Sequence, residues 1–384
     1  APGLRVEGEG GRPVPETRPR QRPSTATGHR MDPTAGPALA LRRAPSLREL
    51  TGRATAQVRG QSAVSSAARA GARLRTTSEA VEPSRELPGK HGSYVIGKAI
   101  GRGAYATVRM ASLTPFSDPK SQRAVAVKIF DRNNPKHWEQ KPGRVNANRE
   151  VSLLRMLRGH PNIVDFVESI DTKSRMFLIM KFCPGVSLGA FAKKQGPSSE
   201  GRARSISRQV LSGLEFTHRH SVVHRDIKLE NLILNTQTRV VQIIDFGFAV
   251  QCSSRTEILK VFCGTPSYMS PAIVRGKGYS GFKGDVWAGA VVLYALLVGR
   301  FPFSAPSERE LYNKIRRGVF SCTNTSLSEP VRSCLNTIFV PEDGARPDAE
   351  QVLAMDWFTR VSPDEMFTGT CTTIRPSTAP SGPR

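Results

Sequence analysis

The first 93 residues and the rest of the chain differ in their pattern of apolar and polar positions. In residues 1–93, arginine, proline, serine, glycine and alanine are frequent, and runs of aromatic or β-branched residues are rare. Such a segment buries too little apolar area to offset the entropy lost on ordering, so we expect a disordered basic extension. An Arg- and Ser-rich, acid-poor composition is also typical of an organelle transit peptide, which leaves organelle targeting open. The first residue is Ala1, so the chain is either a fragment or has its natural start at Met31.

From about residue 94 the pattern becomes that of a folded domain. Alternating apolar and polar residues, or short apolar runs, predict strands at 94–100, 107–112, 123–130, 163–170 and 176–182. Helical spacing over 146–157 predicts a helix that carries Glu150.

Beyond Pro184 helical spacing dominates, and it predicts helices over 205–219, 283–298 and 308–317. Strands first and helices later indicate an α+β fold with a small β-rich lobe followed by a larger α-helical lobe. The longest apolar run, 286–299, is shorter than the roughly 20 residues that span a bilayer, so we expect a buried core helix and no transmembrane segment. Residues 359–384 are polar and contain proline, and we expect a flexible tail there.

Composition adds a strong positive charge, because 56 Lys and Arg residues against 32 Asp and Glu residues give a net charge of +24. A solvated surface with a basic tail accounts for this charge, and so does attraction to phosphate groups, anionic lipid or nucleic acid. Six scattered cysteines form no CxxC pair and no Cys/His metal spacing. This usage fits a reducing compartment and hence an intracellular location, cytoplasmic or nuclear.

Two short motifs have a plain structural explanation when each is taken alone. The run GRGAYATV at 101–108 lies between two predicted strands, where it is either a simple turn or a loop whose backbone approaches phosphates. The run VAVK places Lys128 on an apolar strand, where an outward-facing charge is common. Glu150 on the following helix changes this interpretation, because a lysine held by a glutamate presents a fixed cation to nucleotide phosphates.

Two further motifs are more specific. The run HRDIKLEN occupies 224–231, and DFG occupies 245–247 directly after a hydrophobic strand. A glycine-rich loop, a lysine, a glutamate, HRD…N and DFG thus follow one another along the chain. With these motifs the chain closely resembles the eukaryotic protein kinases over residues 94–358. Supporting matches are HPNIV at 160–164, CGTP at 263–266, DVW at 285–287 and RP at 346–347.

The resemblance implies a two-lobed protein kinase fold, with ATP and Mg²⁺ as cofactors, and a role for each motif residue. Asp226 would accept the proton of the substrate hydroxyl, and Lys228 would stabilise the transferring phosphoryl group. Lys128, paired with Glu150, would neutralise phosphate charge.

The resemblance also implies which residues hold the cofactors. Asn231 and Asp245 would hold Mg²⁺, a hard cation that prefers carboxylate and amide oxygens. The nucleotide would contact the glycine-rich loop, its neighbouring strands and the hinge between the lobes, through Gly101, Gly103, Val108, Ala126, Lys128, Met180 and Cys183.

A narrower resemblance concerns the substrate. Lys228, two residues after Asp226, resembles the serine/threonine branch of the family. Glu230 resembles the acid that receives a substrate arginine, although a solvent-facing acid is the simpler explanation. The runs GKGY at 276–279 and VVLYALLVGRFPF at 291–303 resemble the calcium/calmodulin-dependent and AMP-activated kinase group. The resemblance therefore implies protein substrates with basic residues near the acceptor serine or threonine.

One stretch of the extension, LRRAPSLREL at 41–50, matches that substrate preference. Arg43 lies three residues before Ser46, and leucines lie five residues before it and four after it. We expect autophosphorylation at Ser46, because tethering raises the local concentration of this peptide at the active site. The alternative is that an Arg- and Ser-rich tail produces such a spacing by accident.

The sequence departs from the family pattern at several positions. Ala106 replaces the third loop glycine, and Lys181 replaces a hinge glutamate. Ser187 replaces a second acid that would favour substrate arginine. Val261 stands where relatives often carry an activation-loop threonine, so we expect basal activity without phosphorylation at that position.

The largest departure is at Ala272, where Ala-Pro-Glu of the family becomes Ser-Pro-Ala. In the family this glutamate pairs with an arginine that corresponds to Arg346. We expect Arg346 to need another acceptor or water, because an unpaired buried charge is destabilising.

Two other classes of protein remain as alternatives. A catalytically weak pseudokinase that acts as a scaffold would share the fold, but the set of catalytic and metal-binding residues is complete. A nucleic-acid-binding protein would share the positive charge, but residues 1–93 contain no interleaved aromatic residues and no binding motif.

Overall fold

The computed structural model describes residues 86–103, 106–133, 146–321 and 326–360. All of them belong to one of the two compact units of the chain, Ala44–Arg384. The expected disordered extension lies outside the described residues up to position 85, and so does the expected flexible tail from position 361.

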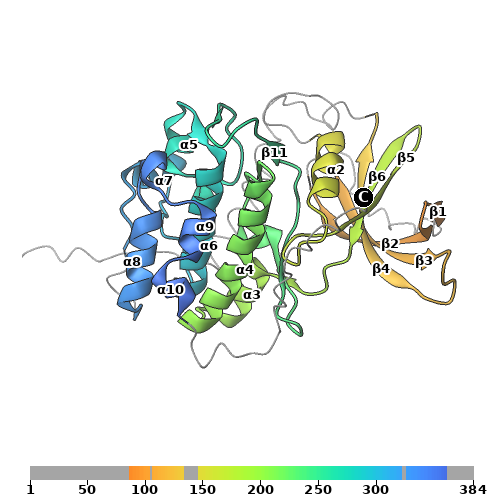
Figure 1. Ribbon diagram of the computed structural model, residues 1–384, viewed down its shortest axis with the longest axis horizontal. Coiled ribbons are helices and arrows are strands. Elements are labelled where there is room, and N and C mark those ends of the chain that lie inside the picture. Colours follow the sequence, from red (N-terminus) through yellow and green to blue (C-terminus); the bar gives the residue numbers. More distant parts are fainter. Residues whose placement is uncertain (1–85, 104–105, 134–145, 322–325, 361–384) are drawn as a thin grey trace, which may run out of the picture. The chain divides into compact units, whose positions relative to one another are not determined.

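A six-stranded antiparallel sheet forms the first lobe, with the strand order β1-β2-β3-β4-β6-β5. The strands are β1 (Glu86–Pro88), β2 (Gly92–Arg102), β3 (Thr107–Pro115), β4 (Arg123–Asp131), β5 (Phe166–Asp171) and β6 (Arg175–Lys181). Helix α2 (Ala147–Met156) accompanies this sheet, as Figure 1 shows on the right.

Alternation along β4 sends its side chains to two separate cores. Val125 and Val127 pack with Phe177 and Ile179 on one face of the sheet. Ala126 and Phe130 belong to the other core, which also includes the buried residues of α2 and continues into the helical lobe. Lys128 lies on the same face of β4 as Ala126 and Phe130, so its side chain is directed towards α2.

The sheet begins earlier than the predicted start at residue 94, because β1 pairs with β2 as a hairpin. A buried carboxylate holds this hairpin: Glu168 on β5 accepts hydrogen bonds from Lys90 N at 2.9 Å and from the Tyr94 hydroxyl at 2.5 Å. The prediction missed β1 because the stretch ELPGK has no apolar alternation, and the partner Glu168 is 78 residues from Lys90 along the chain.

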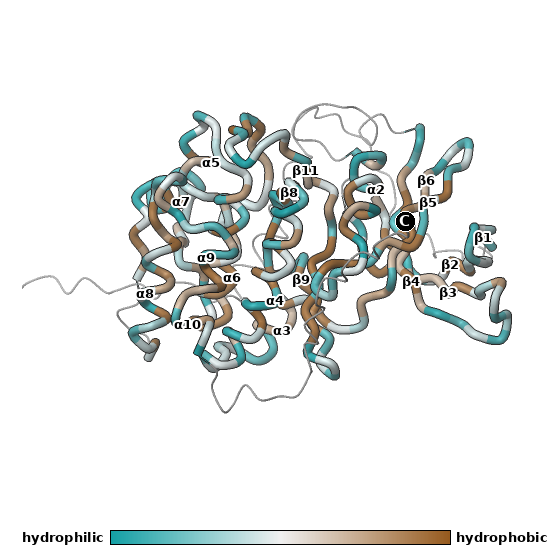
Figure 2. Tube along the Cα trace, viewed as in Figure 1, coloured by the Kyte–Doolittle hydropathy of each residue, from teal (hydrophilic) through white to brown (hydrophobic). Residues whose placement is uncertain are grey.

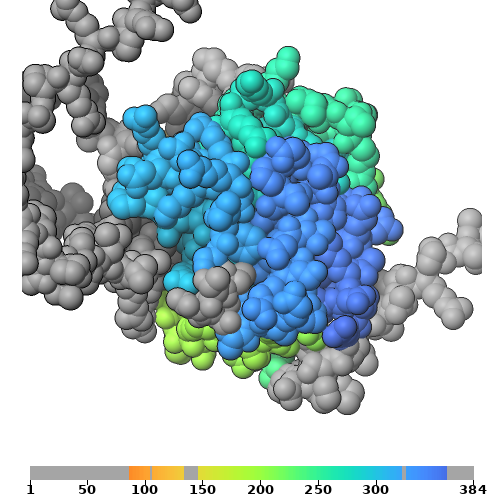
Figure 3. Space-filling model, turned by 90° about the vertical axis from the view of Figure 1, so that its left-hand side faces the viewer, coloured from red at the N-terminus to blue at the C-terminus, as the bar shows by residue number. Residues whose placement is uncertain are grey.

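The second lobe is mainly helical (Figure 1). Its helices are α3 (Leu188–Gln195), α4 (Glu200–Arg219), α5 (Pro271–Arg275), α6 (Gly281–Val298), α7 (Glu308–Arg317), α8 (Glu329–Ile338), α9 (Ala349–Leu353) and α10 (Asp356–Thr359). Small antiparallel sheets join β7 (Val186–Ser187), β9 (Leu232–Leu234) and β10 (Val241–Ile243), β8 (Val222–Val223) with β11 (Val250–Gln251), and β12 (Ile258–Leu259) with β13 (Tyr279–Ser280). The later helices, coloured blue, make up much of the face seen in Figure 3.

Helix α6 is the buried centre of this lobe, and the predicted helix over 283–298 lies within it. It is the one helix among the described residues that is long and apolar enough to cross a membrane, and 89% of its apolar stretch is buried inside the fold. Such burial is what the core helix of a globular lobe requires. On the outer helices, hydrophobic and hydrophilic stretches alternate (Figure 2).

Two predicted boundaries were wrong for identifiable reasons. Helix α4 begins at Glu200 and not at 205, because Ser199 caps it by accepting a hydrogen bond from Arg202 N ahead of the apolar positions. The strand predicted over 163–170 begins only at Phe166, because Ile163 forms an isolated parallel bridge with Ile243 of β10.

Candidate active site

Lys128 lies at the centre of a charge cluster that joins both lobes. Its Nζ is 2.7 Å and 2.9 Å from the two carboxylate oxygens of Glu150 on α2, and 2.8 Å from Asp245 Oδ1. The Lys128 and Glu150 side chains are only 10% and 1% exposed. Burial alone would lower the pKa of Lys128, but the two carboxylates outweigh it and raise that pKa above its usual value. The predicted Lys–Glu pair is therefore formed.

Asp245 follows β10 in a left-handed backbone conformation, with φ of 62°. Burial opposes its ionisation, but the Lys128 ammonium outweighs burial and lowers the pKa of this carboxyl to about 2. The next residue, Phe246, is fully buried and packs edge-on against His224, with 4.8 Å between ring centroids. This packing fixes where the Asp245 carboxylate projects.

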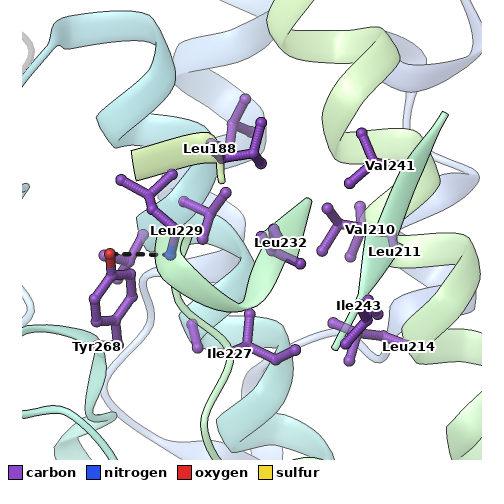
Figure 4. Close-up of a cluster of buried hydrophobic side chains, with 14 of the residues drawn as sticks. Leu188, Val210, Leu211, Leu214, Ile227, Leu229, Leu232, Val241, Ile243 and Tyr268 are labelled. Carbon is purple, nitrogen blue, oxygen red and sulfur yellow. Dashed lines mark hydrogen bonds between the residues drawn. The ribbon is translucent and has the colours of Figure 1, made fainter. Parts of the chain in front are cut away.

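Alternation within HRDIKLEN determines which side chains enter the hydrophobic core and which do not. Ile227 and Leu229 are buried in the hydrophobic core of the helical lobe, where Tyr268 Oη accepts a hydrogen bond from Leu229 N at 3.2 Å (Figure 4). Asp226, just before Ile227, and Lys228, between the two apolar residues, are thereby turned the other way. Two apolar anchors thus hold the catalytic loop.

Within this loop, Lys228 and Asn231 both bind Asp226. Lys228 Nζ lies 2.5 Å from Asp226 Oδ2. Asn231 Nδ2 donates to the Asp226 backbone oxygen at 2.8 Å and to Asp226 Oδ2 at 3.0 Å. Asp285 of α6 anchors the start of the loop, because its oxygens accept hydrogen bonds from His224 N at 2.8 Å and Arg225 N at 2.9 Å.

Thr265 was not predicted as a site residue, yet it binds both Asp226 and Lys228. Its hydroxyl donates to Asp226 Oδ1 at 3.2 Å and accepts from Lys228 Nζ at 3.4 Å. Thr265 is 39 residues from Asp226 along the chain. The available signal was the run CGTP, which contains this threonine.

The residues predicted to hold Mg²⁺ fit that cation. Asn231 uses its amide nitrogen on Asp226, and Asp245 uses Oδ1 on Lys128, so neither Asn231 Oδ1 nor Asp245 Oδ2 has a hydrogen bond within the described residues. Both are the hard oxygens that Mg²⁺ prefers. In residues 86–103, 106–133, 146–321 and 326–360 no cluster of three His, Cys, Asp or Glu residues could hold a metal by itself. The donor set suits a cation held jointly with nucleotide phosphates.

Strand register brings most of the predicted nucleotide-binding residues together. Gly101 on β2 pairs with Val108 on β3, and Val108 pairs with Lys128 on β4. Ala126, two residues before Lys128 and on the same face of β4, pairs with Met180 on β6. A β-carbon on Gly101 would lie in ordinary van der Waals contact with Val108, 3.7 Å from its Cβ.

The other nucleotide-binding predictions concern the loop tip and the hinge. A β-carbon on Gly103 would lie in ordinary van der Waals contact with the Ala106 oxygen, at 3.7 Å. Cys183 is partly buried, with its Sγ 3.9 Å from the Lys181 oxygen, and burial raises the pKa of its thiol to about 11. The Lys181 side chain is held by Asp165, at 2.7 Å.

Glu230 and Ser187 are the two positions that bear on the predicted preference for substrate arginine. Glu230 is exposed, and its carboxylate is close enough to Gly189 that a β-carbon there would lie 3.2 Å away. Ser187 caps α3 by accepting a hydrogen bond from Ala190 N at 3.2 Å. The serine thus has a structural role in place of the second acid of the family pattern.

Comparison with known proteins agrees with this geometry. Residues 94–358 match the family model described as protein kinase domain, and the chain belongs to that family. The predicted two-lobed α+β kinase fold is confirmed.

The relatives are named serine/threonine and catabolite-derepressing kinases. CBL-interacting serine/threonine-protein kinase 8 of Arabidopsis thaliana is 32% identical over 274 residues, which cover 71% of this chain and 58% of the relative. Carbon catabolite-derepressing protein kinase of Candida tropicalis is 32% identical over 287 residues, which cover 75% of this chain and 44% of the relative. CBL-interacting serine/threonine-protein kinase 7 of Arabidopsis thaliana is 32% identical over 285 residues, which cover 74% of this chain and 63% of the relative. The chain thus spans about half the length of the curated relatives it matches, and these relatives support the predicted resemblance to the calcium/calmodulin-dependent and AMP-activated kinase group.

Proposed function

We propose that this protein is a serine/threonine protein kinase that transfers the γ-phosphoryl group of ATP to protein hydroxyls in the presence of Mg²⁺. The observation that carries the proposal is the single polar network of Asp226, Lys228, Asn231 and Thr265, opposite the Lys128 cluster. Phosphoryl transfer requires positioned charges and no covalent nucleophile, and these two groups of side chains supply them.

Each side chain has a task in such a transfer. The Asp226 carboxylate accepts the proton of the substrate hydroxyl and orients its oxygen. Lys228, 2.5 Å from that carboxylate, places a cation beside the reacting groups. Lys128 neutralises phosphate charge without reorganising, because Glu150 already holds it. Asp245 and Asn231 would hold Mg²⁺, which supplies further positive charge to the phosphates.

The test is incorporation of phosphate from Mg-ATP into a serine peptide with neighbouring arginines. Purified full chain should phosphorylate the peptide, and the Asp226→Asn variant, with equal nucleotide binding, should do so about 10²–10³ times more slowly. A pseudokinase scaffold is the alternative function. Folded chain that binds nucleotide and transfers no phosphate would support that alternative.

The preference for basic substrates rests on Glu230. Its exposed carboxylate beside α3 can accept a charge-assisted hydrogen bond from a substrate arginine three residues before the acceptor. Glu230→Ala should raise KM for the arginine peptide and leave KM for its alanine counterpart unchanged. Glu350→Ala, which removes an exposed carboxylate on α9, is the matched control. Equal effects of the two variants would contradict the role of Glu230.

Autophosphorylation at Ser46 would follow from the same preference. Ser46 lies outside the described residues, and the proposal rests on its sequence, with Arg43 three residues before it. Mass spectrometry after incubation with Mg-ATP should find phosphate on Ser46 in the native chain and none in Asp226→Asn. If a free peptide copy is phosphorylated and the tethered serine is not, the preference holds and the self-substrate does not.

An intracellular location, cytoplasmic or nuclear, is proposed from cysteine usage. Within the described part of the chain, Cys183, Cys252, Cys263 and Cys334 are free thiols. Free thiols suit a reducing compartment. Imaging of fluorescent fusions with and without residues 1–93 would test this location and would also reveal organelle targeting by the extension.

A further inference from the structure

Arg346 carries a buried positive charge in the helical lobe. The residue is 1% exposed, and its guanidinium lies over the Trp287 ring, 4.9 Å from the centroid. Its nitrogens donate to the backbone oxygens of Lys283 at 3.1 Å, Ile338 at 3.1 Å and Val340 at 2.8 Å. Carbonyl groups satisfy hydrogen bonds but do not neutralise a charge, so Arg346 also needs an acid.

Asp343 supplies that acid and makes a second bond. Its Oδ1 lies 2.7 Å from Arg346 Nη1, and the Arg346 side chain is fully buried in this pair. Its Oδ2 accepts a hydrogen bond from Ser280 N at 3.1 Å. Ser280 ends β13 and caps α6, so one carboxylate connects the buried arginine to that strand.

The strand β13 in turn holds the activation segment, by which we mean residues 248–270. Ile258 pairs with Ser280 and Leu259 with Tyr279, and the Tyr279 hydroxyl donates to the Val261 oxygen at 3.1 Å. Four residues beyond Val261 comes Thr265, which binds the catalytic aspartate. Hydrogen bonds and strand pairing therefore lead from Arg346 through Asp343 and β13 to Val261, four residues before Thr265.

Helix α5 lacks the acid that the family pattern places there and carries a basic residue instead. Ala272 is a half-buried methyl group that packs against the apolar cluster around Tyr279. Arg275, three residues later, instead reaches Glu342 at 3.3 Å. The acids thus lie in the turn that precedes Arg346, and α5 contributes a base.

We propose that Asp343 is a positioning residue for phosphoryl transfer, which takes the place of the absent glutamate at Ala272 and holds the activation segment through Ser280. The proposal rests on the proposed kinase activity. Asp343 touches no reacting atom and acts through Ser280, Val261 and Thr265.

The first test is Asp343→Asn, which keeps the size of the side chain and removes its charge. A loosened activation segment should lower kcat roughly 10-fold and raise KM for the peptide, since contacting groups in one network are strongly coupled. Binding of a fluorescent ATP analogue should be unchanged, because Lys128 and Glu150 lie outside this chain of contacts.

Glu200→Gln is the matched control for a merely structural role. The Glu200 carboxylate also bridges two elements, accepting from Ser328 N at 2.6 Å and Trp357 Nε1 at 3.3 Å. Its loss should lower Tm and leave peptide KM unchanged. The rescue variant adds Ala272→Glu to Asp343→Asn, which returns the acid to the family's position and should restore kcat and peptide KM.

Each outcome either supports or overturns the proposal. A rise in peptide KM for Asp343→Asn alone, reversed in the double variant, supports the proposal. Unchanged kinetics in Asp343→Asn, or a double variant no better than the single one, overturns it. If Asp343→Asn does not fold, recovery of folding and activity in the double variant supports it, and failure of both overturns it. Inactive native chain instead refutes the kinase activity itself.

Discussion

The Thr265 hydroxyl donates a hydrogen bond to the Asp226 carboxylate, with 3.2 Å between Oγ1 and Oδ1. The bond joins the activation segment to the catalytic loop, and Lys228 Nζ reaches the same hydroxyl at 3.4 Å. Order in the activation segment is therefore coupled directly to the orientation of the Asp226 carboxylate, the group that we propose accepts the substrate proton.

Thr265→Val should lower kcat, because it removes the hydroxyl and keeps the shape of the side chain. A hydrogen bond to a charged group is worth about 1.5 kcal/mol at the low end, which is roughly 10-fold in rate. Thr265→Ser keeps the hydroxyl and should retain most of the activity. Steady-state kinetics with saturating Mg-ATP would measure the difference, and equal losses in the two variants would exclude a role for the hydroxyl.

Lys128→Met, Asp226→Asn and Asp245→Asn should each lower turnover by about 10²–10³, the usual effect of removing one well-placed electrostatic group. The Lys128 and Asp245 changes break the 2.8 Å contact between the lobes, so they should also weaken nucleotide binding. Asp226→Asn should leave that binding intact. Turnover and nucleotide affinity are to be measured on variants with native circular dichroism. Near-native activity of Asp245→Asn would contradict its assignment to the metal.

Basal activity should not require phosphorylation of the activation segment at Val261. That residue has no hydroxyl, and its backbone oxygen is held by Tyr279. Arg225, which would ordinarily meet the phosphate, donates through Nε to the Phe248 oxygen at 2.7 Å. Phosphatase-treated chain should therefore keep most of its activity.

The matched variant for that experiment is Thr256→Ala, since Thr256 is a nearby hydroxyl in the same segment, 3.1 Å from Ser254 Oγ. It should be as active as the native chain. Loss of activity after both phosphatase treatment and this substitution would show that a displaced switch site replaces the usual one.

Alkylation of Cys183 should be slow at neutral pH and accelerate as the pH rises towards 11. The thiolate is the reactive form, and burial raises the pKa of this thiol from 9.0 to about 11. At pH 7.5 the thiolate fraction is therefore roughly 100-fold lower than for an unperturbed thiol. Iodoacetamide labelling followed by peptide mapping would measure the profile.

Bound ATP should slow the Cys183 reaction further if the hinge assignment is right, and Cys183→Ser identifies the labelled peptide. Labelling at pH 7.5 as fast as that of free glutathione would contradict the raised pKa. Labelling at high pH that ignores ATP would contradict the nucleotide-binding role.

The sequence by itself determined the elements and residues whose signals are local. The helix predicted over 308–317 coincides with α7 because Ser307 caps its start and Gly318 ends it in a left-handed conformation, with φ of 65°. Sequence motifs alone identified the candidate site residues Lys128, Glu150, Asp226, Asn231 and Asp245. Alternation in β4 and in the catalytic loop directs Lys128 and Asp226 towards the candidate site.

Only the tertiary structure decided which distant groups satisfy one another. Thr265 reaches Asp226 across 39 residues, Glu168 holds a hairpin 78 residues away, and Asp343 bonds Ser280 at a separation of 63. Periodicity describes which face of an element is apolar, but it carries no information on which acid will meet a given donor after folding. The sequence shows that the family's glutamate is missing at Ala272. It does not show that Asp343 replaces it, because any carboxylate that folding brings close to a buried arginine can neutralise its charge.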